Sequence, residues 1–165
     1  FGFSNTDQII KTIYSQSGKQ FISDTYQLII DREEIIISVL KNHQDDVVVL
    51  EIETEIQNPL SMKFTTTADF SLNKNPNIAK LDFDKLSFPL RLRKWQNGDK
   101  FKPLGMRNFK KVSDFFIDEK YSLLDKQKQW ILCSKDAIIW IVGNRIDDRY
   151  KIDSNTKKVY IAELL

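Results

Sequence analysis

A dense run of basic side chains between residues 91 and 111 is the part of this 165-residue sequence best suited to chemistry with a ligand. It contains eight basic residues and a single acid, Asp99, so its net charge is +7. The basic residues are Arg91, Arg93, Lys94, Lys100, Lys102, Arg107, Lys110 and Lys111. Like charges at this density require either open solvent or an anionic partner. Because arginine and lysine both bind phosphate, we take these eight residues as the candidate binding site.

The charge balance along the chain supports an anionic partner over simple solubility. The whole sequence has a net charge of +2, but residues 1–89 have −5 and residues 90–165 have +7. Residues 112–165 are balanced, so all of the positive excess lies in residues 90–111. Charge that served only solubility would be scattered over the sequence. The residues alone predict a phosphate-rich partner, with RNA, DNA and an acidic protein all open.

Three aromatic residues, Trp95, Phe101 and Phe109, are interleaved with the basic ones. This pattern favours nucleic acid, because cationic side chains contact phosphates while rings stack on exposed bases or riboses. Aromatic residues are also common in protein cores, so packing is the competing interpretation of each ring. If about four to six cations meet phosphates, affinity should fall steeply with salt, with a logarithmic slope of about −0.7 to −0.9 per contact.

The basic run leads directly into a predicted helix at residues 112–119, where apolar residues recur at helical spacing. Within the run, Gly98 and Gly105 permit backbone conformations that other residues resist. Lys110 and Lys111 lie just before the helix, where the positive end of the helix dipole makes lysine unfavourable. We therefore expect a phosphate at the start of this helix, bound by lysines and free backbone N–H groups together.

No other group of residues indicates catalysis or a metal site. The only histidine, His43, lies in a polar segment and has no partners for a metal site or a catalytic triad. The only cysteine, Cys133, excludes an internal disulfide and lies in an apolar strand, where we expect an inert thiol. Asp147 and Asp148 predict a turn with ion pairs. We therefore predict no catalytic residue and no metal in this chain.

Many short strands with few helices predict an α+β fold with mixed or antiparallel strands. Helices are expected at residues 9–14, 112–119 and 123–127. Strands are expected at residues 20–23, 26–30, 34–39, 47–54, 60–64, 78–83, 90–93, 130–133, 138–142 and 159–164. Short polar links at 31–33 and 136–137 predict hairpins.

The bulk composition is typical of a globular, cytoplasmic protein. Hydrophobic residues make up 41% and charged residues 29% of the sequence. No apolar run approaches the ~18 residues that a membrane span needs, and no signal peptide is visible. Because the chain starts at Phe1, we expect a piece of a longer protein. We divide it into a leading helix with a β-rich connector at 1–89 and a C-terminal domain at 90–165.

Four stretches in the second half of the sequence are distinctive in their residue types and in their order along the chain. They are Leu-Arg-Leu-Arg at 90–93, Gly-Asp-x-Phe-x-Pro-Leu-Gly-Met at 98–106, Lys-Lys-Val-Ser-Asp-Phe-Phe-Ile-Asp-Glu-Lys at 110–120 and Ile-Trp-Ile-Val-Gly-Asn-Arg-Ile-Asp at 139–147. In type and order they resemble the C-terminal domain of the tRNA(Ile)-lysidine synthetase family. Residues 1–40 resemble, more weakly, the family's segment that joins the preceding substrate-binding region to this domain.

The resemblance implies a fold similar to a domain of the phenylalanyl-tRNA synthetase β-chain, and binding of the acceptor end of tRNA(Ile) with a CAU anticodon. In the family, an N-terminal domain with a Ser-Gly-Gly-x-Asp-Ser loop uses ATP and magnesium to adenylate the wobble cytidine, and lysine then displaces AMP. The implied partners are tRNA(Ile) and the enzyme's own catalytic domain, with a homodimer left open. The eight basic residues become candidates for RNA contact.

The sequence departs from the whole enzyme because it contains no Ser-Gly-Gly-x-Asp-Ser loop and no two consecutive glycines. We therefore expect no cofactor in this piece, ATP and magnesium only in the full-length ligase, and no activity of the piece alone. Its role would be to bind and position tRNA. One alternative is a protein-interaction or dimerisation module whose basic run meets an acidic partner. A hydrolase is disfavoured because the residues offer no nucleophile with a base and an orienting group.

Overall fold

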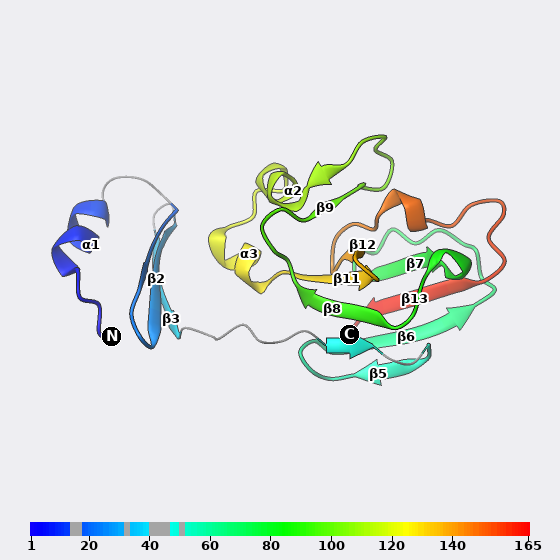
Figure 1. The fold of residues 1–165 in the computed structure, drawn as a ribbon, viewed down its shortest axis with the longest axis horizontal. Coiled ribbons are helices and arrows are strands. Elements are labelled where there is room, and N and C mark those ends of the chain that lie inside the picture. Colours follow the sequence, from blue (N-terminus) through cyan, green and yellow to red (C-terminus); the bar gives the residue numbers. More distant parts are fainter. Residues whose placement is uncertain (14–17, 32–33, 40–46, 50–51) are drawn as a thin grey trace. The chain divides into compact units, whose positions relative to one another are not determined.

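The computed structural model describes residues 1–13, 18–31, 34–39, 47–49 and 52–165, and these residues form two compact units (Figure 1). Unit 1 comprises Phe1–Gln44 together with Tyr121–Gln127. Unit 2 comprises Asp45–Lys120 and Lys128–Leu165. Each unit has its own apolar core, so each is described separately.

Unit 1 is a small antiparallel sheet with helical segments. Helix α1 (Thr6–Ile13) is followed by strands β1 (Lys19–Ile22), β2 (Tyr26–Asp31) and β3 (Glu34–Val39), in the spatial order β1-β2-β3. Ile9 of α1 packs with Leu28 and Ile30, which share one face of β2 because side chains alternate along a strand. The side-chain amides of Gln27 on β2 and Gln127 on α3 (Leu123–Lys128) exchange hydrogen bonds of 2.9 and 3.1 Å, and the α3 residues up to Gln127 belong to this unit.

Unit 2 contains two four-stranded antiparallel sheets. The first has the order β12-β11-β8-β4, from strands β4 (Val47–Val49), β8 (Leu90–Lys94), β11 (Trp130–Ser134) and β12 (Ala137–Ile141). The second has the order β5-β6-β13-β7, from β5 (Thr54–Ile56), β6 (Met62–Thr67), β7 (Ile78–Asp82) and β13 (Val159–Leu164). The last strand of the chain therefore lies between two earlier ones. Short 3-10 turns follow β7 at Phe83–Lys85 and precede β13 at Asp148–Tyr150.

Side chains from both sheets of unit 2 meet in one apolar core. Trp140 and Tyr160, on β12 and β13, are the largest fully buried side chains of this core. Every residue of β11 is buried, as the nearly unbroken apolar sequence of that strand requires. Cys133 on β11 is a free, buried thiol, and burial raises its pKa to about 11, in agreement with the thiol predicted there.

The predicted α+β class is confirmed, and most predicted elements lie within one or two residues of the observed ones. The predicted strand 47–54 is wrong as a single element, because β4 and β5 belong to different sheets. Residues 32–33, within a predicted hairpin, and His43 lie outside the described residues. The compact units divide the chain near residue 44 and not at residue 89, because β6 and β7 both pair with β13.

Candidate nucleic-acid interface

Residues 100–111 form a hairpin, the basic hairpin, whose strands β9 (Lys100–Phe101) and β10 (Lys110–Lys111) are antiparallel. Lys111 lies directly opposite Lys100, and Lys110 lies opposite Phe101. Phe101 is fully buried, whereas Lys100 and Lys111 are exposed. Because directly opposed residues share a face of the ladder, the fold places two lysines opposite each other on its exposed face.

Helix α2 (Val112–Asp118) supports the basic hairpin from its buried side. Its apolar residues Phe115 and Phe116 follow the predicted helical spacing and are buried. The ring of Phe101 meets Phe115 edge-on, with centroids 5.2 Å apart, and Trp95 meets Phe116 in the same way at 5.0 Å. Phe101 therefore anchors the hairpin on α2, and Trp95, just after β8, packs against the same helix, so packing is the correct interpretation of these two rings.

The start of α2 differs from the expected phosphate site. Lys111 occupies the cap position with extended dihedral angles and makes no side-chain cap hydrogen bond. The N–H of Val112, however, donates to the carbonyl oxygen of Asp99 at 2.9 Å, so the first amide of the helix is already used. The helix is also only seven residues long. One of the backbone N–H groups expected to bind a phosphate here is therefore already satisfied within the chain.

Two acids that follow β12 fasten the loop of the basic hairpin. The N–H of Lys102 donates to Asp147 Oδ2 at 2.8 Å, and the N–H of Gly105 donates to Asp148 Oδ1 at 3.0 Å. Gly105 has a φ of +85°, a conformation that side chains resist, and this agrees with the role predicted for that glycine. The loop is thereby held in one shape by hydrogen bonds from its own backbone.

The same two acids form the ion pairs that the sequence predicted for this turn. Asp147 is fully buried and accepts hydrogen bonds from Arg149 Nε and Nη2 at 2.9 and 2.8 Å, which raise the pKa of the guanidinium. The N–H of Gly105, and then the ammonium of Lys151 at 2.9 Å, lower the pKa of Asp148. Arg149 also lies 4.7 Å from the ring centre of Phe109, which orients an exposed aromatic side chain.

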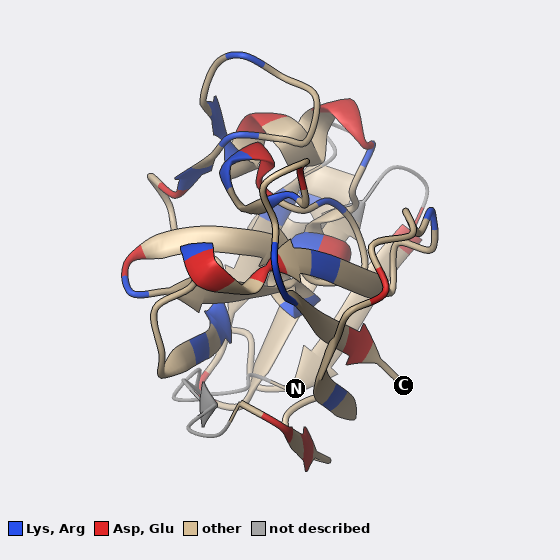
Figure 2. Ribbon diagram, turned by 90° about the vertical axis from the view of Figure 1, so that its right-hand side faces the viewer, with Lys and Arg blue, Asp and Glu red and all other residues tan. Residues whose placement is uncertain are grey.

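The five cations of the basic hairpin divide into two groups. Lys102 pairs with Asp148 at 3.6 Å and Lys110 pairs with Asp118, so these two are partly neutralised. Lys100, Arg107 and Lys111 are exposed, and within the described ranges the structure gives none of them an ion pair. Figure 2 shows the basic segments of the hairpin at the top of the view, with acidic parts of α2 beside them.

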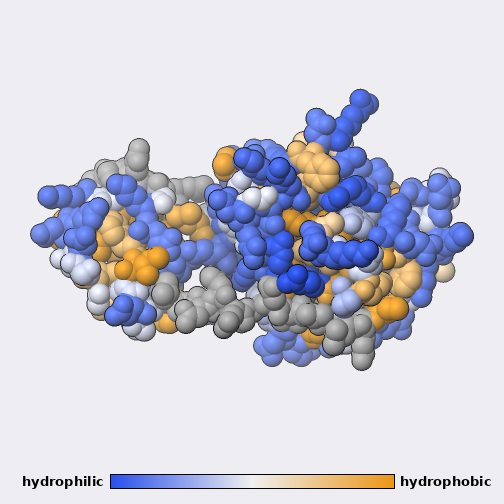
Figure 3. All heavy atoms as spheres, in the orientation of Figure 1, coloured by the Kyte–Doolittle hydropathy of each residue, from blue (hydrophilic) through white to orange (hydrophobic). Residues whose placement is uncertain are grey.

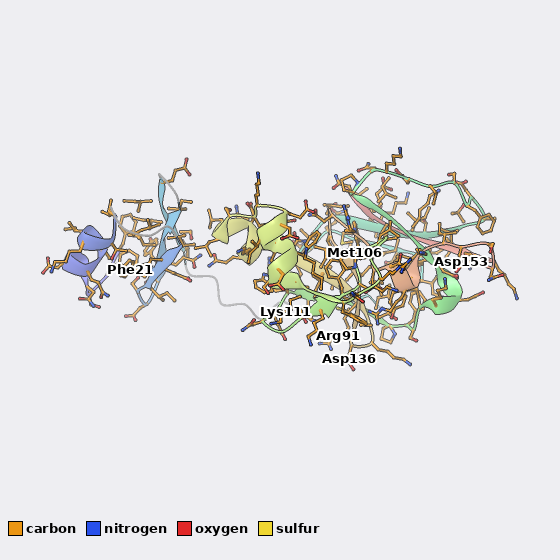
Figure 4. The ribbon with its side chains drawn as sticks, turned by 90° about the horizontal axis from the view of Figure 1, so that it is seen from above. Phe21, Arg91, Met106, Lys111, Asp136 and Asp153 are labelled. Atoms are coloured by element: carbon orange, nitrogen blue, oxygen red, sulfur yellow. The ribbon has the colours of Figure 1, made fainter. Side chains whose placement is uncertain are left out.

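The remaining three predicted cations lie on β8, which belongs to a different sheet from the two strands of the basic hairpin. Arg93 is mostly buried and makes two hydrogen bonds of 2.9 Å to the carboxylate of Asp99. Lys94 donates to the carbonyl oxygen of Lys128 at 2.7 Å and lies 4.4 Å from the ring centre of Trp130. Arg91 is exposed; it is labelled, with Lys111, in Figure 4. The eight cations are therefore not gathered into one set.

Exposed apolar side chains also lie on the basic hairpin and α2. The sequence pattern had indicated Phe109 as a possible stacking residue, but not Leu104, Met106 or Ile117. Leu104 and Met106 are each 42% exposed, Phe109 is 56% exposed and Ile117 is 64% exposed. Figure 3 shows hydrophobic atoms among hydrophilic ones over this region, at the top of the view. A surface that alternates cations with apolar groups can contact both the phosphates and the sugar or base faces of a nucleic acid.

Two family models match the chain at separate places. The TilS substrate binding domain matches residues 1–41, and the TilS substrate C-terminal domain matches residues 90–163, which include every residue of the basic hairpin. This chain belongs to the TilS family. The resemblance inferred from the sequence patterns is thereby confirmed.

Curated TilS relatives match the whole chain. It is 43% identical over 171 residues to a tRNA(Ile)-lysidine synthase of Parabacteroides distasonis and 33% identical over 165 residues to one of Bacteroides thetaiotaomicron. Both matches cover 100% of this chain, but only 39% and 37% of the respective relatives. The chain therefore spans well under half the length of these TilS proteins.

A solved TilS structure has the same fold. The chain superimposes on the crystal structure of a TilS C-terminal domain with a TM-score of 0.62, at 17% sequence identity, covering 72% of this chain and 95% of that one. At this identity the similarity supports the fold alone. Among the residues described, no cluster of three or more metal-ligating side chains occurs, and no helix has the length and apolar character to cross a membrane.

Proposed function

We propose that this chain is the tRNA-binding C-terminal part of a tRNA(Ile)-lysidine synthase, and that the basic hairpin contacts the acceptor end of tRNA(Ile). The pairing of Lys100 with Lys111 is the observation on which this proposal rests. Two like charges held opposite each other cost stability, so an anionic partner is the simplest reason for a fold to place them there. Arg107, in the loop between them, completes the proposed phosphate-binding set.

The other predicted cations have supporting places in this proposal. Arg93 fixes Asp99, whose carbonyl holds the start of α2, and Lys102 and Lys110 fix the hairpin through Asp148 and Asp118. Lys94 packs on Trp130. Arg91 is exposed on β8 and is a second, separate candidate for phosphate contact. Phosphate contacts of this kind position a nucleic acid without reading its sequence.

The activity of the whole enzyme is part of the same proposal. We infer that the full-length protein attaches lysine to the wobble cytidine of the CAU anticodon in a reaction that needs ATP and magnesium. The 165 residues contain no Ser-Gly-Gly-x-Asp-Ser loop, so they would bind and place the tRNA for a catalytic domain of the same enzyme. Such tethering raises the effective concentration of the tRNA at that domain.

A titration of the chain with an acceptor-stem RNA minihelix at several salt concentrations tests this function. Lys100→Ala and Lys111→Ala should each weaken binding and each reduce the slope of log affinity against log salt by about 1. Lys157→Ala removes the same charge from an exposed turn elsewhere in unit 2 and is the matched control, which should leave both quantities unchanged.

Three results would contradict the proposal. Binding that is insensitive to salt, or equal losses for Lys157→Ala and Lys111→Ala, would mean that the hairpin is not the RNA site. Self-association that rises with protein concentration, without RNA binding, would instead favour the dimerisation module. Sedimentation of the free chain across a concentration series distinguishes that outcome.

A further inference from the structure

A groove of about 740 Å³ in unit 2 begins at the basic hairpin and is not used by the function proposed above. One wall is the loop that leads into β7, and the other is the segment from Asn144 to Ile152. Leu104 of the basic hairpin and Glu119 at the end of α2 also line it. The volume lies within the range of roughly 300–1,000 Å³ that is typical of protein sites for small organic groups.

Hydrogen bonds fix both walls of the groove. In the first wall, Asn73 Oδ1 accepts from the N–H of Asn75 at 2.8 Å, and Asn75 Oδ1 accepts from the N–H of Asn77 at 3.0 Å. Lys80 Nζ, just beyond, donates to Asp69 Oδ2 at 2.7 Å and so holds the base of this loop. In the second wall, residue Lys151 forms a β-bridge to Leu81 of β7. The groove is therefore a preformed feature of the fold.

The lining combines three kinds of group. Its apolar part is formed by Leu72, Ile78, Leu104, Ile146 and Ile152. Leu72 is 86% exposed, so a large apolar side chain at the groove lies uncovered. Two exposed cations, Lys74 and Arg145, stand beside it, and the side-chain amides of Asn73 and Asn75 also line the groove. Lys80 and Lys151 are already paired with acids.

We propose that this groove binds unpaired nucleotides that continue from the RNA duplex held by the basic hairpin. The inference rests on the proposed function and adds to it the part of the RNA that is bound. Leu104 belongs to both the hairpin and the groove, so a strand that leaves the hairpin meets the groove directly. Lys74 and Arg145 bind its phosphates, and the apolar side chains contact its bases.

The mixture of groups distinguishes unpaired nucleotides from other anionic ligands. A site for phosphate alone has no need of an apolar surface, and the carboxylate of Glu119 would repel a phosphate at that end of the groove. A duplex buries its base faces by stacking, so only unpaired bases can lie against Leu72 and Ile146. The planar guanidinium of Arg145 can also stack on a base, which a lysine could not do.

The test compares two minihelices with the same duplex, one with a single-stranded 3′ extension and one blunt. We expect the 165-residue chain to bind the extended RNA about tenfold more tightly, because only this RNA can reach the two groove cations, Lys74 and Arg145, with its phosphates. The double variant Lys74→Ala, Arg145→Ala should bind both RNAs with equal affinity. Both side chains are exposed, so the variant should fold, and an unchanged melting temperature verifies this.

Matched variants separate this inference from the proposed function. Lys157→Ala should retain the tenfold preference for the extended RNA, and Lys111→Ala should weaken binding of both RNAs equally. If the unmodified chain binds the two minihelices equally, or if the double variant keeps the preference, the groove inference is wrong while the hairpin proposal stands. If neither minihelix binds in a salt-dependent way, the proposed function itself is wrong.

Discussion

Asp148 shows how one carboxylate positions a binding loop and makes it sensitive to acid. It accepts a hydrogen bond from the N–H of Gly105 and contacts the ammonium groups of Lys102 and Lys151. These contacts lower its pKa below the usual value near 3.9. The ionised group therefore stabilises the folded chain above about pH 4, and this contribution disappears as the pH falls through the lowered pKa.

We expect Asp148→Asn to lower the melting temperature at pH 7 and to flatten its dependence on pH below about 4. The amide can still accept from Gly105, but it offers no charge to the two lysines. Thermal melts of both proteins between pH 7 and pH 2 give the comparison, with Asp136→Asn in the exposed β11–β12 turn as the control. An identical pH profile for Asp148→Asn and the unmodified chain would show that this carboxylate does not hold the loop.

At the scale of elements, the strand pairing of the basic hairpin contains an unfavourable pair of like charges. Lys100 and Lys111 lie opposite each other, and like charges in that relation destabilise a ladder. We expect Lys100→Glu to stabilise the chain by roughly 0.2–1 kcal/mol, because it creates an opposite-charge pair with Lys111. The same change should weaken RNA binding more than Lys100→Ala does, because it removes one cation and also neutralises Lys111.

Urea unfolding at low and high salt measures the expected change in the free energy of unfolding. The gain from Lys100→Glu should be larger at low salt, since the distance over which exposed charges interact falls from about 30 Å at 0.01 M salt to about 3 Å at 1 M. Lys157→Glu, with the same charge reversal at an exposed turn, serves as the control. A loss of stability in Lys100→Glu at low salt would contradict the inference that the two ammonium groups repel each other.

At the scale of the whole molecule, the two units have cores of very different size. The buried apolar residues of unit 1, among those described, are Ile9, Leu28, Ile29 and Ile30, whereas both sheets of unit 2 contribute to a core that includes Trp140 and Tyr160. A small core buries less apolar surface, so unit 1 should unfold at a lower temperature than unit 2.

Two optical probes can follow this difference. All three tryptophans, Trp95, Trp130 and Trp140, belong to unit 2, so their fluorescence should change only in the later transition. Far-ultraviolet circular dichroism should show an earlier partial loss as well. Ile9→Ala should move only the early transition and Leu81→Ala only the late one, each by about 2–5 kcal/mol. A single coincident transition for both probes would show that the units unfold together.

Much of the fold follows from local patterns in the sequence. The strands expected at residues 34–39 and 159–164 coincide with β3 and β13, and the apolar spacing after Lys111 indicated α2. Strand partners did not follow, because the pairing of β13 with both β6 and β7 joins residues about 80 to 100 positions apart, beyond the reach of any local pattern. The same separation explains why the expected boundary at residue 89 differs from the compact units.

For the candidate site too, the sequence predicts one part and only the folded chain determines the rest. Residue types alone concentrated positive charge in residues 91–111 and predicted a phosphate-binding surface, since charge is a property of composition. Only the folded chain determined that Arg93 pairs with Asp99, that Lys110 pairs with Asp118, and that Lys100 and Lys111 face solvent together. Whether a charge is neutralised or displayed depends on a neighbour a few ångströms away, and the register of paired strands sets that distance.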